Sequence, residues 1–150
     1  MMGEAAVDFS TLVETTRAVS ERFEFAVVEG AGGLLVPLDA TRDLCDLASA
    51  LAFPLLVVAP NRLGALSHVR AAVEAARVRR LAITALVLTE VDQAPDPSAE
   101  TNASILRERL GLPVLSFPYC ADDDRRLAAA ADAAGITRLL SGSPSSGPRT

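Results

Sequence analysis

The first residues that could form a ligand-binding site lie in the run Phe23-Glu-Phe-Ala-Val-Val-Glu-Gly-Ala-Gly-Gly33. A short stretch rich in β-branched and aromatic residues ends on one carboxylate, Glu29, and a turn containing Gly30, Gly32 and Gly33 follows at once. This pattern predicts a buried strand with an acid at its carboxyl end and a backbone that comes close to a ligand. On an open α/β sheet, acids at that position commonly hold Mg²⁺ bound to nucleotide phosphates.

A Mg²⁺ site of this kind needs a phosphate-binding loop of the pattern G-x-x-x-x-G-K-[ST], whose lysine reaches the phosphates. The 150 residues contain neither this pattern nor any lysine, because all 14 basic residues are arginine. The sequence therefore predicts part of a nucleotide-dependent site.

The elements that position these residues alternate between apolar runs and helix-compatible segments. The predicted strands are residues 24–29, 55–59, 83–88 and 114–117, and the predicted helices are residues 8–22, 41–51, 64–80, 99–110 and 123–134. Because strands and helices alternate, we expect an α/β fold with a parallel, doubly wound sheet in three layers. The strand runs are continuously apolar, so both faces of the sheet should be covered. Residues 1–140 are expected to form the domain, and residues 141–150, rich in Ser, Pro and Gly, a disordered tail.

Ligands of such sheets bind at the carboxyl ends of the strands. Four segments follow predicted strands and are expected to face one crevice: residues 29–33, 59–64, 89–90 and 118–120.

Composition excludes several classes of function. The net charge of −5 and the lack of an extended basic cluster argue against a nucleic-acid surface. No run of 18 or more residues lacks charge, so no membrane span is expected, and the first residues do not resemble a secretory signal. Cys45 and Cys120 are isolated, without metal or redox spacing, which predicts a reducing, cytoplasmic location.

Three segments of the chain resemble dethiobiotin synthetase, in the same order and at compatible spacing. They are Val28-Glu-Gly-Ala-Gly-Gly-Leu-Leu-Val-Pro-Leu38, then Leu63-Gly-Ala-Leu-Ser-His68, then Thr101-Asn102 with Leu110-Gly-Leu-Pro-Val-Leu115. That family has a P-loop NTPase fold and closes a ureido ring on 7,8-diaminononanoate with CO₂, ATP and Mg²⁺ in biotin biosynthesis. The family's first strand and phosphate loop should precede residue 8, so the chain is similar to the C-terminal portion only, truncated at the N-terminus.

The resemblance implies a metal ligand at Glu29 and a nucleotide site. The implied nucleotide-binding residues are Glu29, Gly30, Ala31, Gly32, Thr89, Glu90, Pro118, Tyr119 and Cys120. The family carries an adenine-reading asparagine where this chain has Thr89-Glu90, and a threonine hydroxyl lacks the paired donor and acceptor of an amide. Each implied role has an alternative. Glu29 could be an acid at a strand end that binds no ligand, and Tyr119 could be a packed surface residue that does not contact a nucleotide.

The resemblance also implies that Leu63, Gly64 and Ala65 bind the substrate carboxylate across a dimer interface, through backbone N–H groups at a helix start. The alternative is an ordinary glycine-containing helix start, with Ser67 and His68 in its first turn. No residue is expected to be catalytic, because His68 lacks a nucleophile or second histidine to work with.

Two functions from different classes remain open. One is part of an enzyme, completed by a second copy in a homodimer or by a chain that supplies the N-terminal part. The other is a non-catalytic binding or scaffold module of the same fold. Because a lysine normally stabilises the transferring phosphoryl oxygens, the chain alone is expected to be inactive. The run Asp122-Asp-Asp124 is interpreted as a helix cap and not as a metal cluster.

Overall fold

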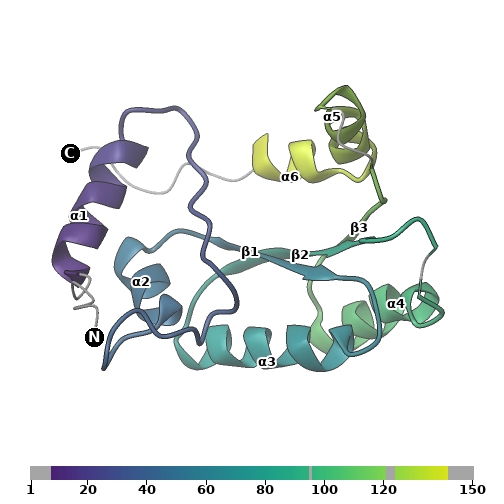
Figure 1. Cartoon of the computed structure of the whole chain (residues 1–150), viewed down its shortest axis with the longest axis horizontal. Helices are drawn as coiled ribbons and strands as arrows, with labels where there is room; N and C mark the ends of the chain where they lie inside the picture. Colours follow the sequence, from purple (N-terminus) through teal and green to yellow (C-terminus); the bar gives the residue numbers. More distant parts are fainter. Residues whose placement is uncertain (1–7, 95, 121–123, 142–150) are drawn as a thin grey trace, which may run out of the picture. The chain divides into compact units, whose positions relative to one another are not determined.

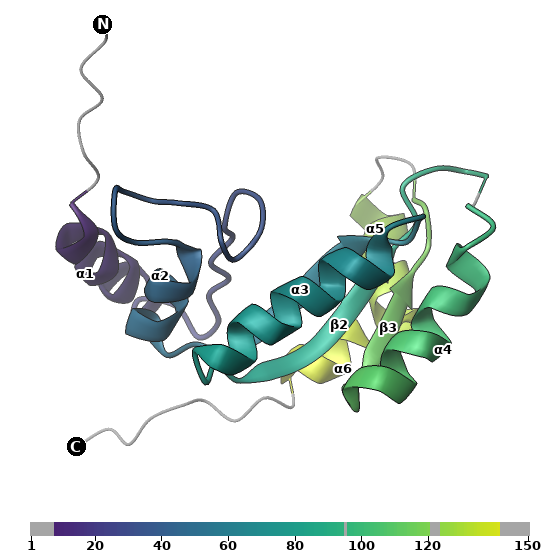
Figure 2. The same ribbon diagram turned by 90° about the horizontal axis from the view of Figure 1, so that it is seen from below.

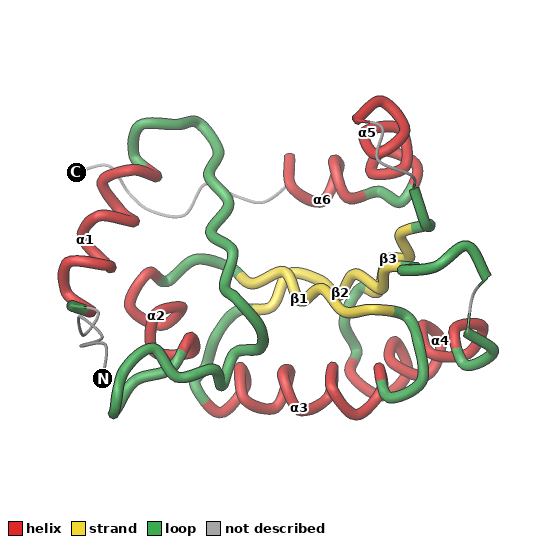
Figure 3. The backbone as a smooth tube through the Cα atoms, in the orientation of Figure 1, coloured by secondary structure: helices red, strands yellow, loops and turns green. Residues whose placement is uncertain are grey.

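The computed structural model describes residues 8–94, 96–120 and 124–141 (Figure 1, Figure 3). The helices are α1 Phe9–Ser20, α2 Leu44–Leu51, α3 Ala65–Val78, α4 Ala99–Leu110, α5 Asp124–Ala133 and α6 Ile136–Ser141, and the strands are β1 Leu55–Pro60, β2 Ile83–Thr89 and β3 Val114–Phe117. The described chain divides into two compact units. The first holds the residues up to Pro54 together with Glu74–Ala82, and the second holds Leu55–Val73 and the residues from Ile83 onward.

The second unit is built on a three-stranded sheet in the order β1-β2-β3. Both strand pairs are parallel, with Val58 opposite Val87 and Thr89 opposite Phe117. Parallel neighbours need a crossover connection, which α3 supplies between β1 and β2 and α4 supplies between β2 and β3. The predicted α/β fold with a parallel sheet is therefore confirmed.

Helices lie on both faces of this sheet. Within the second unit, α4 and the first part of α3 lie on one face, and α5 and α6 lie on the other (Figure 1, Figure 2). Successive side chains of a strand point to opposite faces, and the four consecutive residues from Ala85 to Leu88 of β2 are all buried. Both faces of the central strand are thus covered, as the continuous apolar run predicted.

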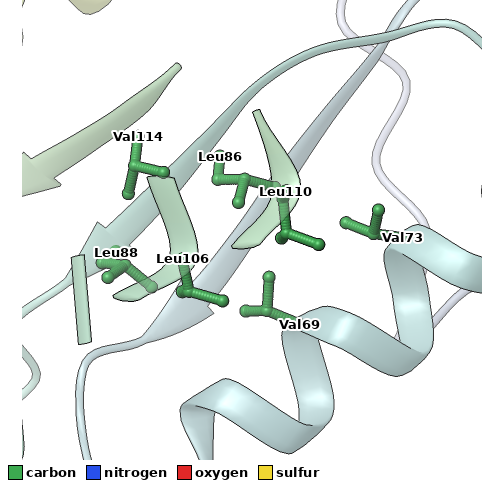
Figure 4. Packing of buried hydrophobic residues seen from close by; sticks show 7 residues of the cluster. All are labelled: Val69, Val73, Leu86, Leu88, Leu106, Leu110 and Val114. Atoms are coloured by element: carbon green, nitrogen blue, oxygen red, sulfur yellow. The ribbon is translucent and has the colours of Figure 1, made fainter. Parts of the chain in front are cut away.

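The core of this unit lies between the sheet and the helices α3 and α4 (Figure 4). Its buried members are Val69, Val73, Leu86, Leu88, Leu106, Leu110 and Val114. Fully burying one such side chain contributes about 1.5–3 kcal/mol, so this cluster is the main favourable contribution to the folding of the unit.

Local sequence signals set the ends of several elements. Helix α4 ends at Leu110 because Gly111 adopts a left-handed φ of +64°, and both α4 and β3 have the predicted bounds. Gly135, with φ +81°, ends α5 in the same way, but α6 follows at once and was not predicted. Ser141 still belongs to α6, and the rest of the predicted tail lies outside the described residues.

The first unit contains α1 and α2. Helix α2 starts at Leu44, three residues after its predicted start, because the side chain of Asp43 accepts the N–H of Asp46 and the side chain of Asp46 accepts the N–H of Asp43. The guanidinium of Arg79 binds both of these carboxylates. The capping box and the ion pairs together fix where the helix begins.

The predicted strand at residues 24–29 is wrong. No residue in 24–29 is in a strand, and Phe25 and Val27 are 54% and 76% exposed. A strand forms only when its backbone groups pair with a neighbour, and the described residues show no backbone hydrogen bond from this segment. Its β-branched and aromatic composition is therefore not enough to make a strand.

Candidate functional site

The turn between β1 and α3, residues 61–65, lies at the carboxyl end of β1. The N–H of Ala65 donates to the carbonyl of Arg62 at 3.0 Å, which closes a four-residue β-turn. Gly64 occupies the third position with φ +93°, a value that a type II turn requires and that side-chain-bearing residues rarely adopt. The sequence folds this way because glycine supplies that conformation at no steric cost.

Two buried asparagines hold this turn. Asn61 and Asn102 are 4% and 2% exposed, and they are the buried polar residues among those that the structure describes. The Asn102 side-chain amide donates to Oδ1 of Asn61 at 3.0 Å and to the carbonyl of Arg62 at 3.4 Å. We call Asn61 and Asn102 the asparagine pair. It connects helix α4 to the β1–α3 turn.

The asparagine pair also reaches the carboxyl end of β2. The side-chain amide of Asn61 donates to Oε1 of Glu90 at 2.6 Å and to the carbonyl of Ala99 at 3.3 Å. Its backbone N–H donates to the carbonyl of Thr89 at 2.8 Å. Two of the predicted nucleotide-binding residues, Thr89 and Glu90, therefore lie beside the β1–α3 turn.

A carboxylate also faces this turn. Asp96 accepts hydrogen bonds from the hydroxyl and the backbone N–H of Ser98, at 2.7 and 2.8 Å. These bonds, the one from the hydroxyl first, hold the pKa of Asp96 below its usual range, and the backbone N–H of Leu63 lowers this pKa further. The carboxylate of Asp96 is therefore held in its ionised form.

Among the described residues, the N–H groups of Gly64 and Leu66 make no hydrogen bond, whereas the N–H of Ala65 donates to the carbonyl of Arg62. Unpaired N–H groups at a helix start, with the positive end of the helix dipole, suit an anionic group such as a carboxylate. Of the residues implied for substrate binding, Ala65 has an engaged N–H and Gly64 has an unengaged one.

Pro118, Tyr119 and Cys120 follow β3, whose end is paired with the end of β2 in the parallel register. Tyr119 is 44% exposed, and Cys120 is half-buried with a free thiol. These three residues therefore lie at the same edge of the sheet as Thr89 and Glu90, and their nucleotide contacts stay a prediction.

The segment from Glu29 to Gly33 belongs to the first unit. All five residues are exposed. A Cβ on Gly30 would lie 2.9 Å from Cδ1 of Leu44, and Gly32 has a left-handed φ of +82°. Packing and backbone conformation thus account for both glycines. Because residues 29–33 lie in the first unit and the other three segments lie in the second, the meeting of all four segments at one crevice stays a prediction.

The described residues include Glu29, the metal ligand that the resemblance implies. They contain no group of three or more His, Cys, Asp or Glu residues arranged to hold a metal ion. Glu29 supplies one exposed carboxylate, and Mg²⁺ bound through one or two carboxylates usually relies on substrate phosphates as well. Within the run Asp122-Asp-Asp124, Asp124 is the first residue of α5, and the other two lie outside the described residues.

The sequence did not predict the asparagine pair. Asparagine is common in loops, so its position in a sequence does not indicate burial. These two side chains become buried only through the tertiary fold. The usable signals were the Thr101-Asn102 motif and the placement of Asn61 directly after an apolar strand.

The comparison with protein families decides the membership of this chain. The model of the AAA domain family matches residues 3–122. The chain belongs to this family. The family match agrees with the parallel sheet and its covering helices, and it supports the P-loop NTPase-like fold that the sequence predicted.

Several individual relatives of the chain are dethiobiotin synthetases. An ATP-dependent dethiobiotin synthetase of Anaeromyxobacter dehalogenans is 43% identical over 121 residues, which cover 80% of this chain and 54% of the relative. An enzyme of the same name from another Anaeromyxobacter species is 46% identical over 64% of this chain and 43% of its own length. An enzyme of this name from Haloferax mediterranei is 34% identical over 78% of this chain and 50% of its own length. The resemblance to dethiobiotin synthetase is confirmed, and the chain spans about half the length of these relatives.

No helix within the described ranges has the length and apolar character needed to cross a bilayer.

Proposed function

We propose that this chain is the C-terminal portion of a dethiobiotin synthetase. In this proposal it takes part in the ATP- and Mg²⁺-dependent closure of a ureido ring on 7,8-diaminononanoate with CO₂, in biotin biosynthesis. The observation that carries the proposal is the 43% identity to an ATP-dependent dethiobiotin synthetase over 80% of the chain. The unengaged N–H groups of Gly64 and Leu66, at the carboxyl edge of the sheet, support it.

The role proposed for the β1–α3 turn is to bind the carboxylate of 7,8-diaminononanoate. A carboxylate held by backbone N–H groups at a helix start needs no lysine or arginine, because the N–H groups and the helix dipole provide the positive potential. Binding this remote group orients the substrate so that its two amines reach the reacting carbon.

ATP and Mg²⁺ would supply activation of the carboxylated amine when both are bound. The 150 residues contribute no lysine and no phosphate loop to that step. Loss of such preorganised charge stabilisation typically costs on the order of 10²-fold or more in rate. We therefore propose that this chain, assayed by itself, does not form dethiobiotin.

The proposed partner is a second copy of the chain or a chain that carries the phosphate loop. Among the described residues β1 pairs with β2 alone, and Val58 of β1 is 58% exposed. In the first unit, Phe23, Phe25 and Val27 are all more than half exposed. Exposed strand edges and apolar patches are surfaces on which other chains dock. We also propose a cytoplasmic location, which the two free thiols support.

A second candidate function is a non-catalytic binding or scaffold module derived from the same fold. The absence of lysine from all 150 residues favours it. Such a module would keep the sheet and the carboxylate-binding turn without turning over a substrate.

The test is incorporation of labelled bicarbonate into dethiobiotin in the presence of ATP, Mg²⁺ and 7,8-diaminononanoate. We expect no product above a no-protein blank from the purified chain, and product after the N-terminal half of a curated relative is added. Product from the chain alone would contradict the proposed inactivity. No product with the added half, although the two pieces bind each other, would favour the scaffold module.

A further inference from the structure

The carboxylate of Glu90 is fixed at one oxygen and open at the other. Its Oε1 accepts a hydrogen bond from the side-chain amide of Asn61 at 2.6 Å, and the backbone N–H of Glu90 donates to the carbonyl of Phe117 at 2.9 Å. Among the described residues, no group donates a hydrogen bond to Oε2. Glu90 directly follows β2, the central strand, at the carboxyl edge where parallel sheets bind their ligands. A half-buried acceptor is therefore open at this edge.

The asparagine pair fixes which way the amide beside Glu90 points. A backbone carbonyl can only accept, so Asn61 must turn its amide nitrogen to the carbonyl of Ala99, and the same nitrogen faces Glu90. The side chain of Asn102 likewise turns its nitrogen to the carbonyl of Arg62 and to Oδ1 of Asn61. Glu90 must therefore present an acceptor to Asn61.

An ionised carboxylate offers acceptors alone, so it selects ligands that offer N–H donors. Oε1 of Glu90 keeps a lone pair beside the one that Asn61 uses, so both oxygens can accept. Among the common bases, guanine offers two adjacent donors on one edge, N1–H and the N2 amino group. Adenine and cytosine offer one amino group beside an accepting ring nitrogen, and uracil offers one N–H between two carbonyls. A carboxylate thus pairs best with guanine, through charge-assisted hydrogen bonds.

We propose that Glu90 is a specificity-determining residue of the nucleotide site, whose carboxylate accepts the N–H donors of the base and so favours guanine over adenine. The inference rests on the proposed function for one point, namely that a nucleotide binds with its base at this edge. Tyr119, which is 44% exposed and follows Phe117 by two residues, supplies an aromatic ring for stacking that does not depend on the base. The relatives are named as ATP-dependent enzymes, so this chain would differ from them in the base that it prefers.

The first experiment compares the binding of GMP and AMP. The two share a ribose and a phosphate, so the ratio of their dissociation constants reports the base alone, and NMR titration of the ¹⁵N-labelled chain measures it even when both bind weakly. We expect GMP to bind about tenfold more tightly than AMP, the effect of one charge-assisted hydrogen bond. IMP, which lacks the N2 amino group, should bind about as weakly as AMP. Equal affinity for GMP and AMP, or no binding of either, would overturn the inference.

Glu90→Gln tests the residue itself. The amide nitrogen of Asn61 still needs an acceptor, so the oxygen of the introduced amide should take that place and its NH₂ group should occupy the open position. That donor would meet the two donors of guanine, whereas adenine offers it an accepting ring nitrogen. We expect the preference for GMP to disappear, with AMP binding at least as tightly.

Glu108→Gln is the matched control, because it makes the same change of charge on an exposed residue of α4 and should keep the wild-type ratio. A preference for GMP that persists in Glu90→Gln, or that is lost equally in Glu108→Gln, would overturn the role of Glu90. If Glu90→Gln does not fold, the series of GMP, IMP and AMP on the wild-type chain decides.

The second experiment separates this inference from the proposed function. The assay with labelled bicarbonate, with the N-terminal half of a relative added, is run with ATP and with GTP. A GMP preference that depends on Glu90, without product from either nucleotide, supports the inference and counts against the proposed function. Product together with equal binding of GMP and AMP overturns the inference and supports the proposed function.

Discussion

Asn61 and Glu90 are joined by a 2.6 Å hydrogen bond from the side-chain amide of the first to the carboxylate of the second. The two residues follow neighbouring parallel strands, so this bond links the ends of β1 and β2. It places an acceptor-only carboxylate against an amide that has donors to offer, which is the arrangement that satisfies both groups.

Asn61→Asp should destabilise the chain by about 2–4 kcal/mol at pH 7, because two carboxylates then face each other in a part-buried site. The loss should shrink as the pH is lowered toward about 4, because one of the two carboxyl groups takes up a proton. Urea unfolding at several pH values measures this. The double variant Asn61→Asp with Glu90→Gln restores an amide–carboxylate pair and should recover most of the stability. Equal losses in the single and double variants would contradict the explanation.

Lowering the pH should reduce the stability of the first unit, because Asp46 then takes up a proton. Its hydrogen bond from the backbone N–H of Asp43, together with Arg79, lowers the pKa of Asp46. A carboxyl group whose pKa is lower in the folded state adds stability above its unfolded pKa and loses it as the pH falls below about 4. Asp46→Asn should therefore be less stable than wild type at pH 7 and should lose less stability between pH 5 and pH 3.

Thermal unfolding across this pH range is the measurement. Asp132→Asn removes an exposed aspartate of α5 outside this cluster and should leave the acid response as in wild type. A response in Asp46→Asn as steep as in the wild-type chain would count against this role of Asp46.

Arg80→Gly should stabilise the chain by about 0.5–1 kcal/mol. Arg80 follows α3 with a left-handed φ of +56°, which costs a side-chain-bearing residue roughly 1–2 kcal/mol and costs glycine little. Part of the gain is offset because glycine makes the unfolded chain more flexible. Ala71→Gly, an exposed position inside the same helix, should instead lose about 1 kcal/mol. The unfolding midpoints of the two variants should move in opposite directions, and a shift in the same direction would refute the argument.

The isolated chain should bind ATP with Mg²⁺ more weakly than a dissociation constant of about 10 μM, or roughly −7 kcal/mol. The chain has no lysine to bind the phosphates of ATP. The hydroxyl of Thr89 lies 3.4 Å from the carbonyl of Ala59 and cannot replace both the donor and the acceptor of an amide. Titration calorimetry tests this expectation. Glu29→Gln should bind equally weakly. Binding tighter than about 10 μM that disappears in Glu29→Gln would show that the site is occupied after all.

Elements whose signals are local were predictable from the sequence. Helix α4 ends at a left-handed glycine, and β3 is a short apolar run after a proline, so both bounds were found. The segment at residues 24–29 failed because a strand depends on a neighbour that no local pattern reveals. Helix α6 was missed because Gly135 signals the end of one helix but not the start of the next.

The candidate site was predictable in outline and not in detail. The parallel topology placed Leu63–Ala65 and Thr89–Glu90 at one edge of the sheet, as expected. Which N–H groups of the turn are engaged depends on the conformation of the turn, in which the N–H of Ala65 donates to the carbonyl of Arg62. A pattern of residue types carries no information on such contacts, so Gly64 could not be separated from its neighbours.

Within the described part of the chain, the outer side of β1 pairs with no other strand, which exposes the newly made chain to aggregation. Its run Leu55-Leu-Val-Val-Ala59 has the β-branched, uncharged character of segments that stack into fibrils when left uncovered. Encounters between identical copies grow with concentration, whereas pairing with the proposed partner chain depends on how soon that partner is synthesised nearby. If the proposed partner covers β1, high expression of this chain alone should yield inclusion bodies, and simultaneous synthesis of both chains should keep it in solution.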